Sequence, residues 1–112
     1  MERKLEEGGT MPEFVTVARA EDVAEGKVRA FDVLGTPVAL ARVEGSVYAF
    51  GDICTHRQCN LSASEPEGTT IECECHGSVF DLSTGAVLNG PATEPIATFE
   101  VREEGGDLKV GA

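Results

Sequence analysis

The chain has 112 residues, 41% of them hydrophobic, and a formal net charge of −11 at pH 7. This length fits one domain whose core does not require disulfides. The charge argues against nucleic acid, whose phosphates repel an acidic protein, and favours a basic partner protein, although acidity by itself also aids solubility.

Short apolar runs separated by turn residues predict an all-β fold. One helical turn is expected within residues 19–27, and a two-residue hairpin turn at Glu44–Gly45. In the run that begins at Ile96, we expect Ile96 to face outward and Ala97 inward. The predicted strands are 14–18, 27–33, 38–43, 46–50, 69–73, 78–82, 86–88, 96–104 and 107–110.

The strand pattern is interrupted in the middle of the chain. Residues 51–69 are rich in Gly, Cys, Ser, Pro and Glu and have little apolar periodicity. We therefore expect residues 51–92 to form a lobe inserted into a scaffold built from both ends of the chain. Residues 1–11 are expected to be a flexible tail, and residues 12–112 to be the folded domain.

All four cysteines and both histidines lie in two boxes, CTHRQC (54–59) and CECHGS (73–78). Two thiolates and two imidazoles can bind zinc tetrahedrally or hold a [2Fe–2S] cluster. Zinc fingers usually place both cysteines in one knuckle and both histidines in another. Here each box supplies one cysteine and one histidine, which favours a two-iron centre held from both sides. The candidate ligands are Cys54, His56, Cys73 and His76.

The pattern C-x-H-x16-C-x-x-H-G, followed by SVFD (78–81) and NGPA (89–92), resembles the Rieske [2Fe–2S] family. The resemblance covers residues 14–110, nearly the whole chain. It implies a Rieske fold of three stacked antiparallel sheets, with a cluster-binding lobe that carries one [2Fe–2S] cluster per chain.

The same resemblance assigns roles to individual residues. It implies that Cys54 and Cys73 bind the inner iron, and that His56 and His76 bind the outer iron near solvent. It also implies that Pro91 belongs to a proline loop that covers the cluster from a third side.

Three residues of the second box and the strand after it are expected to surround the cluster. Gly77 suits a tight turn or a close backbone approach. Ser78 stands where high-potential members have a serine that hydrogen-bonds a bridging sulfide and so stabilises the reduced cluster. Phe80 replaces the tyrosine of those members. We predict a potential between those of low-potential ferredoxins and bc-type proteins, within the range of about −150 to +300 mV.

Two cysteines remain, Cys59 and Cys75. Buried free cysteines often serve as small apolar fillers. The two boxes, however, resemble those of the Rieske proteins of cytochrome bc-type complexes, and this resemblance implies a Cys59–Cys75 disulfide between the loops. Such a bond would limit the opening of two loops with little apolar content.

The leading interpretation is a soluble, cytoplasmic one-electron carrier rather than an enzyme. We expect the ferredoxin component of a multicomponent oxygenase, with a reductase and a terminal oxygenase as partners. We also expect no membrane anchor, because no apolar run approaches about 18 residues, and a monomer by default. One alternative is a small Rieske subunit of a larger oxidoreductase, nitrite-reductase-like or bc-type. A structural zinc-binding module is the distant alternative.

Overall fold

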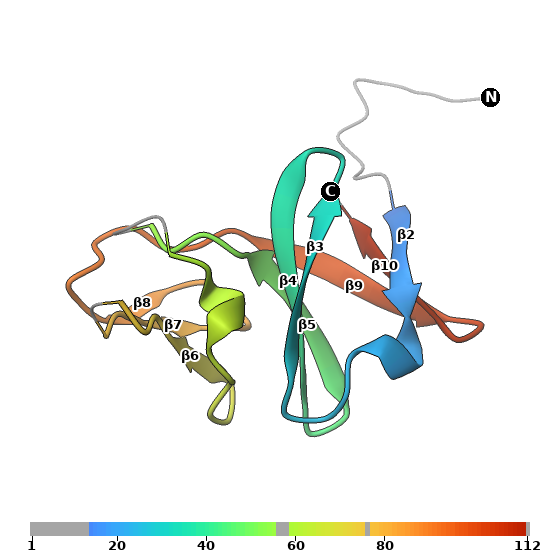
Figure 1. Cartoon of the computed structure of the whole chain (residues 1–112), viewed down its shortest axis with the longest axis horizontal. Helices are drawn as coiled ribbons and strands as arrows, with labels where there is room; N and C mark the ends of the chain where they lie inside the picture. The colour runs from blue at the N-terminus through green and yellow to red at the C-terminus, as the bar shows by residue number, and fades with distance from the viewer. Residues whose placement is uncertain (1–13, 56–58, 76, 112) are drawn as a thin grey trace.

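The computed structural model describes residues 14–55, 59–75 and 77–111 (Figure 1). Its regular elements confirm the all-β prediction, since none of the described residues lies in an α-helix. The predicted tail lies outside the described residues, and the domain boundaries stay a prediction. The elements are β2 (Phe14–Arg19), η1 (Ala20–Asp22), β3 (Val28–Val33), β4 (Thr36–Val43), β5 (Ser46–Gly51), η2 (Leu61–Ala63), β6 (Thr70–Glu72), β7 (Val79–Asp81), β8 (Val87–Asn89), β9 (Thr98–Glu104) and β10 (Asp107–Gly111).

The strands form a six-stranded sheet in the order β2-β10-β9-β5-β4-β3 and a three-stranded sheet in the order β6-β7-β8. Neighbouring strands are antiparallel throughout. Strand β9 changes partners along its length: Thr98 and Phe99 pair with β5, and Glu100–Glu104 pair with β10. The six-stranded sheet therefore combines two of the three predicted antiparallel sheets, which share strand β9. Figure 1 shows the small sheet at one end of the long axis, with β2 and β10 toward the other end.

Tight turns fix the register of the large sheet. Glu44 and Gly45, which join β4 to β5, have φ angles of 52° and 83°. Positive φ at both central residues is the signature of a type I′ turn, whose twist matches that of the flanking strands. The predicted two-residue hairpin is confirmed at this position.

Strand β4 is buried on both faces and contributes to two hydrophobic clusters. Val38 and Leu40 lie in the cluster inside the large sheet, whereas Ala39 and Ala41 lie in the cluster that continues into the small sheet. Successive side chains of a strand point to opposite faces, so one strand connects both cores. The second cluster also contains Cys54 and Cys73, Leu61, Ile71, Phe80, Leu82, Ala92 and Ile96.

The predicted orientation of Ile96 and Ala97 was wrong. Ile96 is 4% exposed, and Ala97 is exposed. Strand β9 begins only at Thr98, so strand alternation does not govern Ile96. Its N–H instead donates a hydrogen bond to the carbonyl oxygen of Gly85 at 2.9 Å, and its side chain packs in the cluster that continues into the small sheet. Among the described residues, no helix is long and apolar enough to cross a membrane.

Candidate metal centre

The two boxes are closed by equivalent hydrogen bonds. The N–H of Cys54 donates to the carbonyl oxygen of Cys59 at 2.9 Å, and the N–H of Cys73 donates to the carbonyl oxygen of Ser78 at 2.7 Å. Each six-residue box is therefore closed by a hydrogen bond from its first residue to its last. Cys54 follows shortly after β5, and Cys73 follows β6 directly, so each box is mounted on the end of a strand.

The first cysteine of each box is buried. Cys54 is 3% exposed and Cys73 is 1% exposed, and neither belongs to a disulfide. Both pack in the hydrophobic cluster that contains the fully buried ring of Phe80. The structure thus places two of the four predicted ligands in one core, protected from solvent.

The other two predicted ligands, His56 and His76, lie outside the described residues, as do Arg57 and Gln58. The complete ligand set therefore stays a prediction. Gly77, next to His76, has a φ of 81°, and its N–H donates to the carbonyl oxygen of Cys73 at 2.9 Å.

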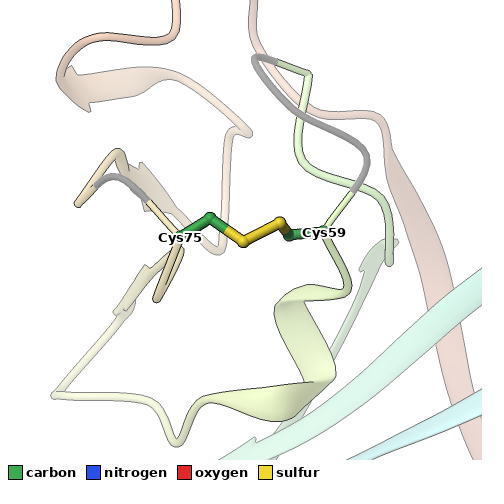
Figure 2. The surroundings of a disulfide bond; sticks show 2 residues. All are labelled: Cys59 and Cys75. Atoms are coloured by element: carbon green, nitrogen blue, oxygen red, sulfur yellow. A yellow bond between two sulfur atoms is a disulfide. The ribbon is translucent and has the colours of Figure 1, made fainter.

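A disulfide joins Cys59 of the first box to Cys75 of the second, the pairing that the resemblance implied. Figure 2 shows it spanning the gap between the segment before η2 and the loop after β6. Cys59 is half-buried and Cys75 is exposed. The sulfur atoms of Cys59, Cys73 and Cys75 lie within 4.8 Å of one another. While the disulfide is intact, two of these three sulfurs are not available as thiolate ligands.

A third segment, which contains Pro91, is tied to both boxes. The N–H of Ala92 donates to the hydroxyl of the fully buried Ser78 at 3.0 Å. The hydroxyl of Thr55 donates to the carbonyl oxygen of Glu94 at 2.6 Å. Pro91 itself is exposed. Together with the disulfide, these bonds connect the three segments in pairs and so restrict their relative movement.

Ser78 provides a test of whether these residues fit a [2Fe–2S] cluster. Its hydroxyl accepts the hydrogen bond from Ala92, and within the described part of the chain it donates to no protein acceptor. A buried hydroxyl normally finds an acceptor for its proton. A sulfide beside Cys54 and Cys73 would be such an acceptor, and their buried thiols are soft ligands suited to iron–sulfur clusters. The residues present therefore fit the cluster.

Asp52 is a site residue that the sequence analysis missed. It is 1% exposed, and its carboxylate accepts hydrogen bonds from Asn60 and Ser62 on the far side of the first box. This contact sets the position of η2, whose Leu61 is fully buried. Leu61 is the single large apolar residue of segment 55–68, and its polar neighbours could have indicated an anchored turn there.

An acidic hollow of about 330 Å³ lies beside the second box. Glu74, which lines it, stands between Cys73 and Cys75 in the sequence. Lys27 donates a hydrogen bond to Glu65 at 2.8 Å and holds the pKa of that carboxyl below its usual value. The lining residues are Ser64, Glu65, Glu67, Thr70, Glu72, Glu74 and Val79.

Comparisons with known proteins agree with this architecture. Residues 13–100 match the family model described as the Rieske [2Fe–2S] domain. The ferredoxin component of the naphthalene 1,2-dioxygenase/salicylate 5-hydroxylase systems of Ralstonia sp. is 38% identical over 91 residues, covering 81% of this chain and 88% of that protein.

Solved structures give the same result. The ferredoxin of carbazole 1,9a-dioxygenase from Nocardioides aromaticivorans superposes with a TM-score of 0.83 at 32% identity, covering 91% of this chain and 98% of that one. A chain from a complex of reduced oxygenase and oxidised ferredoxin in carbazole 1,9a-dioxygenase has a TM-score of 0.82 at 35% identity, covering 88% of this chain and 92% of that one.

Proposed function

The chain belongs to the Rieske [2Fe–2S] domain family, and from this premise we propose that it is the ferredoxin component of a multicomponent oxygenase system. It is an electron-transfer protein rather than an enzyme, and a bound cluster supplies reversible one-electron exchange. The observation that carries the proposal is the pair of buried thiols, Cys54 and Cys73, at the start of two boxes that close in the same way.

Within this proposal, the chain holds the cluster from both boxes. Cys54 and Cys73 would bind one iron, and His56 and His76 would bind the other. Ser78, whose hydroxyl accepts a hydrogen bond from Ala92, would donate its proton to a cluster sulfide. The Cys59–Cys75 disulfide and the contact between Thr55 and Glu94 hold the boxes and the proline loop in one arrangement in both oxidation states.

The proposed partners are a reductase that donates the electron and a terminal oxygenase that accepts it. A relative at 35% identity was solved in a complex of oxygenase and ferredoxin. The net charge of −11 and the carboxylates beside the second box favour partners with basic docking faces. We also propose that the protein works as a monomer in the cytoplasm.

Metal and sulfide analysis of the matured protein tests the proposal. We expect iron and acid-labile sulfide in equal amounts, and an EPR spectrum of the dithionite-reduced protein with a mean g below 2, as expected when two histidines ligate one iron. Replacing His76 with Cys should lower the potential, because a thiolate adds negative charge to the cluster. A colourless protein that contains zinc would contradict the proposal.

One observation favours a second candidate, a Rieske subunit of a larger oxidoreductase. The Cys59–Cys75 disulfide is the feature by which the boxes resemble bc-type proteins. Partner behaviour distinguishes the two functions. A ferredoxin should pass electrons between separately purified reductase and oxygenase and should be released between turnovers. Stable co-purification with a large partner at high salt would favour the subunit instead.

A further inference from the structure

Asp52 connects the residues just before the first box with the residues just after it. Its carboxylate accepts the Ser62 N–H at 2.7 Å and the Ser62 hydroxyl at 3.0 Å, and it accepts the side-chain amide of Asn60 at 2.7 Å. Its peptide N–H donates to the carbonyl oxygen of Pro37 at 3.1 Å, and its carbonyl oxygen accepts the N–H of Leu61 at 2.6 Å. These bonds join strand β4, the residues just before Cys54 and the residues just after Cys59.

The carboxylate of Asp52 is buried and accepts hydrogen bonds from neutral donors. Both oxygens accept N–H groups, which suits the ionised form, since that form is an acceptor only. None of the ion pairs among the described residues involves Asp52. Buried charges are usually paired, because desolvation is costly. This one stands two residues before the buried Cys54, so its field acts in a region of low dielectric.

We infer that Asp52 is a positioning residue with an electrostatic effect: it fixes the first box and lowers the reduction potential of the bound cluster. Reduction adds an electron, and a nearby buried negative charge makes that addition less favourable. Glu74 is closer still in sequence to a predicted ligand, since it directly follows Cys73, but it is exposed, and solvent and salt screen its charge. The inference rests on the proposed function, because it needs a cluster held by the first box.

The test compares D52N with E74Q by protein-film voltammetry at low and high salt. Asparagine has the shape of aspartate, and its bonds can be kept if the Asn60 amide flips and the Ser62 hydroxyl turns to accept. We expect D52N to raise the potential by the equivalent of about a tenfold change in the reduction equilibrium, or ~59 mV for one electron. The shift should persist at high salt, and the EPR g values should stay those of the wild type. E74Q should give a smaller shift that disappears at high salt.

Two further variants separate position from charge. D52A removes the carboxylate bonds to Asn60 and Ser62, and we expect a severalfold loss of bound iron. S62A removes the hydroxyl that donates to the Asp52 carboxylate but keeps the carboxylate and the Ser62 N–H bond. The negative charge of Asp52 is then less compensated, so the reduction potential of the cluster should fall. This variant decides the electrostatic claim even if D52N does not retain its cluster.

An unchanged or lowered potential in a cluster-loaded D52N would overturn the electrostatic claim, and so would an unchanged or raised potential in S62A. Full iron content in D52A would overturn the positioning claim. Absence of iron from the wild-type protein would instead refute the proposed function, so the two failures are distinguishable.

Discussion

The six-stranded sheet, here called the scaffold, and the segment 51–92, here called the lobe, are stabilised in different ways. The scaffold has strands of five to eight residues and a core of Val, Leu and Ala side chains. The three strands of the lobe have three residues each. Its boxes are held by a disulfide and by the hydrogen bonds of two buried polar side chains, Asp52 and Ser78.

This difference separates folding from function. Many small hydrophobic contacts stabilise the scaffold, and each contributes modestly, so no single contact decides the fold. The lobe has buried apolar side chains of its own, such as Leu61, Ile71 and Phe80, but few interactions join its two boxes to each other and to the segment of Pro91. The loss of any one of these links should therefore change cluster retention more than global stability, because loops held by few contacts open at lower free energy than a core sheet does. The following predictions test that separation.

The largest effect is expected for G85A in the lobe. Gly85 has a φ of 81°, and an added Cβ would collide with the carbonyl oxygen of Ile96. That collision would break the hydrogen bond between Ile96 and Gly85 that holds the chain leaving the lobe. We expect loss of the cluster absorbance and of amide protection in β7 and β8, while β4 stays protected.

G45A is the matched control in the scaffold. Gly45 has a similar φ of 83°, but an added Cβ there would meet open space. Only the cost of the left-handed conformation applies, about 1–2 kcal/mol, and the cluster should remain bound. Equal cluster loss in the two variants would show that lobe and scaffold are not separable.

The next largest effect is expected from removing the disulfide. The bond closes a loop of 16 residues between the boxes, and loop-closure entropy of this size corresponds to about 3 kcal/mol. We expect the C59S/C75S double variant to lose its cluster much faster on warming than the wild type. The melting transition of the scaffold, followed by amide exchange in β4, should move far less.

Reduction of the wild-type protein provides the control for that pair. Cys75 is exposed, so a dithiol reductant should reach the bond without unfolding the chain. Reduced wild type and the double variant should then lose the cluster at similar rates. Unchanged retention in both would mean that the hydrogen bonds alone hold the boxes together.

The sequence predicted the scaffold and the chemistry of the boxes for different reasons. Periodic apolar runs and the turn at Glu44–Gly45 encode the long strands locally, so their pattern is readable. The cysteines and histidines are recognisable because ligand chemistry fixes their type and spacing. The roles of Asp52 and Ile96 could not be predicted in this way. Asp52 acts through hydrogen bonds to Ser62, across the first box, and Ile96 is positioned by its bond to Gly85 rather than by strand periodicity.

A smaller effect is expected at the cluster itself, from Ser78 and Phe80. S78A removes a hydroxyl that is available to donate to the cluster, so it should lower the potential. F80Y adds a donor at a fully buried position and should raise the potential. Each shift should be on the order of 59 mV, a tenfold change in the equilibrium for one electron. Film voltammetry measures both, and no change in either variant would contradict a hydrogen-bond control of the potential.

The smallest effect is expected from the ion pair between Lys27 and Glu65. Among the ion pairs of the described residues, it alone joins the scaffold to the lobe, and both side chains are exposed. Lys27 lowers the pKa of Glu65, so the pair stabilises the folded chain above the ordinary glutamate value of about 4.3. That contribution disappears as the pH falls through the lowered pKa.

E65Q should therefore reduce stability slightly at pH 7, should match the wild type in acid, and should lose its effect in high salt. Thermal melts at both pH values, with the cluster absorbance recorded in parallel, measure this. Exposed pairs contribute little because water competes for both charges. A decrease at pH 7 as large as that caused by removing the disulfide would contradict the separation of lobe and scaffold, since a single surface contact would then couple cluster retention to the stability of the large sheet.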